Sequence, residues 1–174
     1  IASLYWDLEE SDKANKYFTL ALRGFQQGAG KDIPEVRDNI AKLVYASAGS
    51  QMQLFKNTRL KGVIDNDIVA SKTELFESLQ EGYYSVLDFE SAKWSLLALY
   101  RLYEVNEEYA QFLQNAPLPE MSVEESEQYK EIIGQKVAEY RTEGQEFISS
   151  GEQLSKRIKA LDPTLSDYQM KQKT

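Results

Sequence analysis

The sequence predicts an all-α protein built from antiparallel helix pairs. Apolar residues recur at the three- and four-residue spacing of an amphipathic helix through most of the chain, and no stretch shows the sustained alternation of a strand. Glycine and proline are sparse, with 9 and 4 residues among 174, while 42% of the residues are hydrophobic and 28% are charged. This composition is typical of a globular helical chain and excludes the fibrous and disordered classes.

Cysteine and histidine are both absent from the sequence. Their absence excludes the usual zinc sites, thiol or imidazole nucleophiles, a Ser-His-Asp triad and disulfide bonds. A metal held by this chain alone would have to be a hard cation bound by oxygen ligands. We therefore expect no cofactor.

The net charge of −8 limits the classes of partner. Basic residues are dispersed along the chain, without the clustered stripe that nucleic acid binding needs. No stretch approaches the ~20 apolar residues of a membrane span, so we expect no direct membrane insertion. The chain begins at Ile1 and continues at once as a helical pattern, and we expect it to be a segment of a longer or processed polypeptide.

The helical patterns divide the chain into five segments. They are a helix pair in 1–30, a long helix and its connection in 31–66, a second helix pair in 67–119, a long capped helix or helix pair in 120–162, and a polar tail in 163–174.

Start signals mark the second and third of these segments. Asp32 can cap a helix that has Pro34 in its first turn, where a missing N–H costs no helical hydrogen bond. We expect this helix to end near Asn57. Asp67 or Ser71 is expected to cap the helix that follows.

Further signals mark the helices of the second half. Ser91 is expected to open one helix, and Pro117 ends it. Ser122 and Glu125 form an S-x-x-E capping box, in which each side chain accepts from a free backbone N–H at the helix start. Glycines in the long helix that follows predict a kink or break near 149–151.

The first helix pair has the packing pattern of a tetratricopeptide (TPR) repeat, which it resembles. Tyr5 precedes a short acidic turn, followed by Ala14, Phe18 and Ala21 at spacings of four and three. The small alanines let the second helix approach the first, and the aromatic rings fill the space between them. Residues 159–163 resemble the end of a TPR second helix.

The middle of the chain, 84–134, resembles the TPR-like helical arrays of large bacterial cell-envelope proteins, including those associated with gliding motility. The shared pattern is an acidic turn, an aromatic A-x-Y-R helix, an N-A-P-x-P break and an S-x-E-E-x-x-x-Y helix start. Here these elements are 88–91, Trp94 with Ala98, Tyr100 and Arg101, 115–119 and 122–129.

The resemblance implies a right-handed superhelical array of helix pairs. It further implies a bacterial scaffold, periplasmic or associated with the cell envelope, whose partners are other proteins or adjoining repeats of the same chain.

Charge is distributed unevenly along the sequence. Residues 61–128 carry 14 acidic and 4 basic side chains, whereas both flanking sections carry eight basic and seven acidic ones. One interpretation of this excess is a solubilising surface. The other is an acidic patch that meets a basic partner or the basic face of a neighbouring repeat, because such a field steers association.

The candidate partner-binding residues lie on the two helices of 67–119. Tyrosine and arginine are enriched at binding surfaces, and this helix pair combines them with acidic residues. Arg101 is expected to face inward and to pair with Asp88 or Glu81. The candidates are Tyr84, Trp94, Tyr100, Arg101, Tyr103, Glu104, Glu107 and Glu108.

Two other site types are suggested by residue patterns, and each has a simpler interpretation. The run 65–67 begins like a calcium loop, but Ala70 and Phe76 stand where an EF-hand requires glycine and glutamate, so a helix cap is expected there. The many carboxylates could form a general acid and base pair, which requires one carboxyl in an apolar pocket. Their position in runs near helix starts indicates solvated surface.

The sequence therefore favours a non-enzymatic scaffold for protein–protein interaction. The alternative is a carboxylate-based enzyme or ligand-binding helical bundle, which needs two inward carboxylates in one pocket. A third interpretation is a spacer whose helices bury surface only against adjoining repeats.

Overall fold

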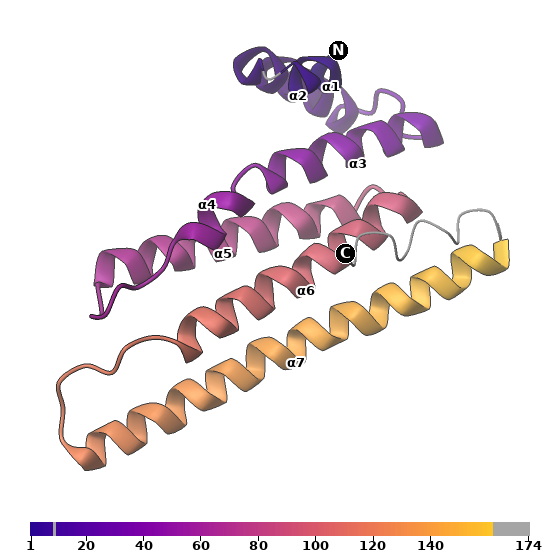
Figure 1. Ribbon diagram of the computed structural model, residues 1–174. Helices are drawn as coiled ribbons and strands as arrows, with labels where there is room; N and C mark the ends of the chain where they lie inside the picture. The colour runs from indigo at the N-terminus through magenta and orange to yellow at the C-terminus, as the bar shows by residue number, and fades with distance from the viewer. Residues whose placement is uncertain (9, 162–174) are drawn as a thin grey trace.

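The computed structural model describes residues 1–8 and 10–161 (Figure 1). This part of the chain contains seven α-helices and no strand. The all-α prediction is confirmed. The helices are α1 (Ala2–Asp7), α2 (Ser11–Gln26), α3 (Pro34–Gly49), α4 (Met52–Asn57), α5 (Asn66–Leu87), α6 (Ala92–Gln114) and α7 (Val123–Leu161). The predicted tail, 163–174, lies outside the described residues.

The long helices α3, α5, α6 and α7 form a layered stack in which successive members run antiparallel (Figure 1). α6 is the central member, because it contacts α3, α5 and α7. The short hairpin of α1 and α2 lies across the α3 side of this stack. None of the described helices is both long and apolar enough to cross a membrane.

Two aromatic clusters fill the core on the two sides of α6. Tyr45 of α3 lies with its ring centroid 5.4 Å from those of Tyr83 on α5 and Trp94 on α6. On the other side, Phe76 of α5 stacks on Tyr109 of α6 at 4.2 Å, and Tyr140 of α7 meets both rings edge-on. Packing against both neighbours therefore holds α6 in place.

The turn between α2 and α3 depends on glycine. Gly28 and Gly30 have φ angles of +104° and +72°, which residues with a side chain rarely adopt. The first residue of α3 is Pro34, as the sequence suggests, but the preceding position is Ile33 and no side chain caps the helix. The expected cap by Asp32 is therefore wrong.

The segment expected to be one helix from Pro34 to near Asn57 is two. α3 ends at Gly49 and α4 begins at Met52, with a turn through Ser50 in which its hydroxyl donates to the Ser47 carbonyl oxygen at 2.7 Å. The turn lets α4 bury Phe55 completely. Tertiary burial thus overrides a continuous helical pattern.

Other helix starts agree with the sequence in part. Ser91 caps α6 by accepting from the Trp94 N–H, and Ser122 and Glu125 form the predicted capping box before α7. The cap of α5 is Asp65, whose carboxylate accepts from two backbone N–H groups. Asp67 and Ser71 lie inside α5, so the expectation that one of them caps it is wrong.

α7 is one continuous helix through the predicted break near 149–151. A Cβ atom at Gly144 would lie 3.4 Å from the Tyr103 ring, and one at Gly151 would lie 3.6 Å from Leu96. Both contacts are with α6. The glycines therefore bring α7 close to α6, and the packing offsets their low helix propensity.

Candidate functional site

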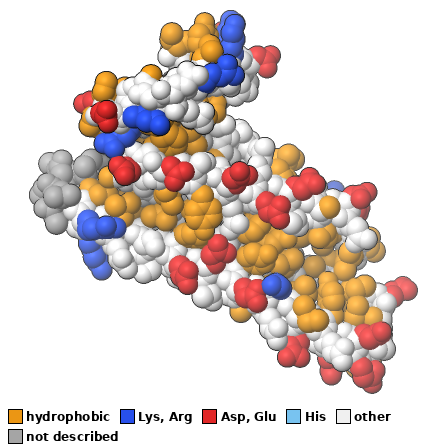
Figure 2. Space-filling view, turned by 180° about the vertical axis from the view of Figure 1, so that it is seen from behind, with side chains coloured by type: hydrophobic (Ala, Val, Ile, Leu, Met, Phe, Trp, Pro, Cys, Tyr) orange, Lys and Arg blue, Asp and Glu red, His pale blue; other side chains and the backbone are white. Residues whose placement is uncertain are grey.

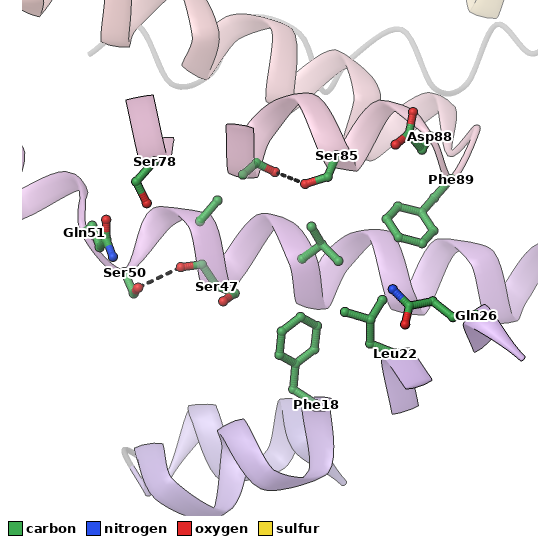
Figure 3. Close-up of a pocket in the computed structure, with 13 residues that line it drawn as sticks. Phe18, Leu22, Gln26, Ser47, Ser50, Gln51, Ser78, Ser85, Asp88 and Phe89 are labelled. Carbon is green, nitrogen blue, oxygen red and sulfur yellow. Dashed lines mark hydrogen bonds between the residues drawn. The ribbon is translucent and has the colours of Figure 1, made fainter. Parts of the chain in front are cut away.

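A cleft of about 440 Å³ lies between α2, α3 and α5 (Figure 3). Its lining combines apolar side chains with small polar ones. The lining residues are Phe18, Leu22, Gln26, Val44, Ser47, Ala48, Ser50, Gln51, Ser78, Gly82, Ser85, Asp88 and Phe89.

Small residues on α3 and α5 make the base of this cleft. A Cβ atom at Gly82 would lie 2.8 Å from the Cβ atom of Ala48, so the two helices are in close contact there. Ser78 and Ser85 lie four and three residues from Gly82 and hence on the same side of α5. Short side chains along both helices leave a recess that larger residues would fill.

α2 provides the opposite wall. Phe18 and Leu22 project from α2 toward α3, on the far side of the cleft from the serines (Figure 3). Both side chains are half-buried and pack against the core. The cleft therefore offers apolar contact from one helix and a mixed surface from two others.

Two of the four serine hydroxyl groups that line the cleft are bonded to backbone carbonyl oxygens nearby in the sequence. Ser50 donates to the Ser47 carbonyl oxygen, and Ser85 donates to the Gly82 carbonyl oxygen at 2.9 Å. Asp88 is the carboxylate of the lining and lies at one end (Figure 3). Such a surface suits the side chains of a protein segment, because it offers apolar contact from Phe18 and Leu22.

The eight residues proposed from the sequence lie outside the cleft, Tyr84 on α5 and the other seven on α6. One group faces α3 and α4, where the Arg101 guanidinium donates to the Tyr45 hydroxyl at 3.1 Å and to Glu104 at 2.5 Å. Lys56 of α4 also pairs with Glu104. The expected pairing of Arg101 with Asp88 or Glu81 is therefore wrong, because the packing of α6 on α3 brings Tyr45 to Arg101 and Glu104 lies one turn along α6.

The charges in this group depend on one another. Burial alone would raise the pKa of Glu104, but hydrogen bonds from Lys56 and Arg101 outweigh it and the pKa lies below its usual range. Burial would lower the pKa of Arg101, and its bonds to Tyr45 and Glu104 raise it instead. Glu104 is therefore a structural carboxylate that stays ionised.

Glu108 pairs with a buried lysine on α5. Its carboxylate lies 3.5 Å from the Lys72 ammonium and 3.8 Å from Arg59. Lys72 is fully buried, donates to the Phe55 carbonyl oxygen at 2.5 Å and lies 3.8 Å from the centroid of the Phe55 ring. Burial lowers the pKa of Lys72, while Glu108 acts in the opposite direction.

Three of the remaining candidates face α7. The Tyr84 ring meets Phe147 edge-on at 5.6 Å, Glu107 lies 3.3 Å from Arg141, and Tyr103 lies against the α7 backbone at Gly144. These contacts with α7 reduce the accessible surface of the three side chains, although Tyr84 remains 42% exposed.

The last two candidates differ in exposure. The Tyr100 side chain is 40% exposed, whereas Trp94 packs on Tyr45 and its indole Nε1 is buried without a hydrogen-bond partner. The eight residues thus share α5 and α6 but do not surround one recess.

The calcium-like run 65–67 is a helix cap, as expected. The Asp65 carboxylate accepts from the N–H groups of Asp67 and Ile68 at 3.0 and 3.3 Å. Within residues 1–8 and 10–161, no group of three or more acidic side chains is arranged to hold a metal ion.

Sequence analysis missed the cleft and Lys72. The small residues Ser78, Gly82 and Ser85 at spacings of four and three were a usable signal for a recess. Lys72 stands between apolar positions of α5 at helical spacing, which signals burial. No protein-family model matches the chain, and neither a curated protein nor a solved structure is significantly similar to it.

Proposed function

We propose that this chain is a non-enzymatic scaffold that binds another protein in the cleft between α2, α3 and α5. The open cleft, with the apolar side chains of Phe18 and Leu22 on one wall, is the observation that carries the proposal. Its volume is that of a site for a few side chains, and the hydroxyls of Ser50 and Ser85 are already hydrogen-bonded. An apolar segment of a partner protein is the occupant that fits.

The resemblance to TPR-like arrays supports a wider form of this proposal. In that form, the helix pairs are part of a right-handed superhelical scaffold in a bacterial envelope assembly. The antiparallel stacking of α3, α5, α6 and α7 is compatible with a helical array, and α2 forms a wall of the cleft as a helix of a preceding pair does.

The carboxylate-based alternative receives less support. A general acid needs a raised pKa, whereas the hydrogen bonds from Lys56 and Arg101 lower the pKa of Glu104. Glu107 and Glu108 are likewise engaged by basic side chains. We therefore propose structural roles for these carboxylates.

Peptide selection tests the proposal. A random-peptide library displayed on phage is selected against the purified chain, and the selected peptides are titrated against two variants. Ser78→Trp fills the cleft, and Ser149→Trp places the same side chain on an exposed position of α7. We expect Ser78→Trp to weaken binding at least about tenfold, equivalent to about 1.4 kcal/mol, and Ser149→Trp to leave it unchanged.

Equal binding to Ser78→Trp and the unchanged protein would overturn the proposal. So would a selection that enriches no peptide above background. Circular dichroism of both variants verifies that each retains the helical fold.

A further inference from the structure

A second surface of different chemistry lies where α7 begins. Hydrophobic side chains gather there and acidic side chains border them, at the lower right of Figure 2. On α7 this surface includes Tyr129, Ile132 and Ile133, which we call the α7 apolar stripe. Ile132 is 58% exposed, and the other two are half-buried. Their spacing places them on one side of the helix.

The length of α7 explains why the stripe is only partly covered. Tyr140 is level with Tyr109 of α6, because their ring centroids are 5.0 Å apart. At 1.5 Å per residue, α7 begins at Val123, about 25 Å before Tyr140. α6 ends at Gln114, only about 8 Å beyond Tyr109. The first turns of α7 therefore extend well past the end of its main packing partner.

α5 covers α7 only farther along. The contacts between them are Phe76 with Tyr140, Gln80 with Glu143, and Tyr84 with Phe147. All of these lie on the C-terminal side of the α7 apolar stripe. Among the described residues, no contact of this kind joins α5 to the first turns of α7.

Acidic residues flank the stripe at helical spacing. Glu125 and Glu139 lie seven residues before and after Ile132, which is two helical turns in each direction. Glu77 is exposed on α5. It lies one turn after Thr73, whose hydroxyl is hydrogen-bonded to the Tyr109 hydroxyl at 2.8 Å.

Acidic side chains outnumber basic ones around the stripe, because residues 123–139 carry five glutamates and two lysines, Lys130 and Lys136. The Lys136 ammonium lies 2.7 Å from the Glu139 carboxylate. The stripe is also next to the section 61–128, in which 14 acidic residues oppose 4 basic ones. The apolar surface thus lies in a negative field, which attracts a positively charged partner.

We propose that the α7 apolar stripe docks a basic amphipathic helix from a partner protein. The apolar residues of that helix contact Tyr129, Ile132 and Ile133, while its Lys or Arg residues meet the flanking Glu125 and Glu139. The distance between these two glutamates along α7, about 21 Å, matches a partner helix of about four turns. Docking of an amphipathic helix through its apolar face is a recurrent mode of recognition.

A second copy of this chain fits the surface less well. A symmetric pairing through the stripe would bring the same glutamates of both copies together, and like charges in an interface are unfavourable. This second surface is separate from the α2–α3–α5 cleft, so the two proposals can fail independently.

Three designed peptides of about 18 residues test the charge requirement. All carry the same leucine and isoleucine ridge, and their flanking positions are lysine, glutamine or glutamate. We expect the lysine peptide to bind at least about tenfold more tightly than the glutamine peptide at low salt, with the difference shrinking as salt rises. The glutamate peptide should bind least well.

Two variants of equal exposure test the location. Ile132→Gln removes an apolar contact from the stripe, and Leu4→Gln changes an α1 residue that is 59% exposed. We expect Ile132→Gln to weaken binding of the lysine peptide at least fivefold and Leu4→Gln to leave this affinity unchanged. Replacing Glu125 and Glu139 together by glutamine, which a capping box also accepts, should reduce the preference for lysine over glutamine flanks.

Three results would overturn the proposal. They are equal affinity for the three peptides, equal affinity of Ile132→Gln and the unchanged protein for the lysine peptide, and a dimer in sedimentation that Ile132→Gln dissociates and the lysine peptide does not. None of them affects the cleft, because Ser78→Trp tests that site separately.

Discussion

The Lys72 ammonium donates a hydrogen bond to the Phe55 carbonyl oxygen at 2.5 Å, in a fully buried position between α4 and α5. It also lies over the Phe55 ring and near Glu108. A carbonyl oxygen, an aromatic ring face and a carboxylate surround this buried cation. Because burying a charge is costly, these contacts stabilise the position of α4 only if the Lys72 side chain also fills the space between the helices.

Replacing Lys72 separates packing from charge. Lys72→Ala leaves a cavity and removes the hydrogen bond to Phe55, and we expect a loss of about 2–4 kcal/mol in the free energy of unfolding. Lys72→Met retains most of the side-chain volume, and the Phe55 carbonyl still accepts from the Thr58 N–H, so its loss should be much smaller. Urea unfolding at pH 7 measures both.

The pH dependence of this pair has a defined sign. Burial lowers the pKa of Lys72 below 10.5, so the unfolded chain binds the proton more tightly than the folded one. The stability of the unchanged protein relative to Lys72→Met should therefore rise with pH until 10.5. A difference that falls over this interval would contradict the burial argument.

Ionisation of the buried Tyr83 side chain should destabilise the fold at alkaline pH. Burial raises its pKa from 10.0 to about 12, because the phenolate cannot be solvated in the core. The folded state then holds the proton that the unfolded state releases, so stability is lost as pH rises from 10 toward 12. Tyr83→Phe should remove up to about 2–3 kcal/mol of that loss, measured by urea unfolding across this range. An identical alkaline slope in the variant contradicts this assignment.

Glu104 should contribute stability that disappears in acid. Its pKa is depressed by Lys56 and Arg101, so the contribution is present above its ordinary value of 4.5 and is lost as pH falls through the lower folded value. We expect Glu104→Gln to cost about 1–2 kcal/mol at pH 7, and the difference from the unchanged protein to shrink below pH 4.5. A deficit that stays constant with pH would mean that the charge is not involved.

Two glycine-to-alanine substitutions should change the stability of the fold in opposite directions. Gly82→Ala places a Cβ atom 2.8 Å from that of Ala48, and we expect a loss of about 1–3 kcal/mol. Gly134→Ala adds a methyl group with nothing within 4 Å, and its higher helix propensity should add about 1 kcal/mol. Thermal unfolding of the two variants compares them directly, and stabilisation by both would show that α3 and α5 are not in close contact.

Local signals made several helix starts predictable. Ser91 and the pair Ser122 and Glu125 cap helices through side-chain contacts a few residues away, which the sequence displays directly. The turn at Ser50 was not predictable in this way, because it depends on the burial of Phe55 against α5.

Long-range geometry limited the prediction of the candidate sites. Arg101 bonds Tyr45, which is 56 residues away, and that contact depends on how α3 packs on α6. The cleft likewise requires α2 to lie opposite Gly82, and helical periodicity assigns Phe18 and Leu22 only to an apolar face. Spacing therefore identifies which residues face inward but does not identify the helix that they contact.

The most direct test of the scaffold proposal is a nuclear magnetic resonance titration of the ¹⁵N-labelled chain with a peptide from the library selection. The proposal predicts that the largest amide shifts cluster around the cleft, at residues such as Leu22, Ser47 and Gly82, and that Ser78→Trp suppresses them. Shifts that map to other surfaces and persist in Ser78→Trp would contradict it.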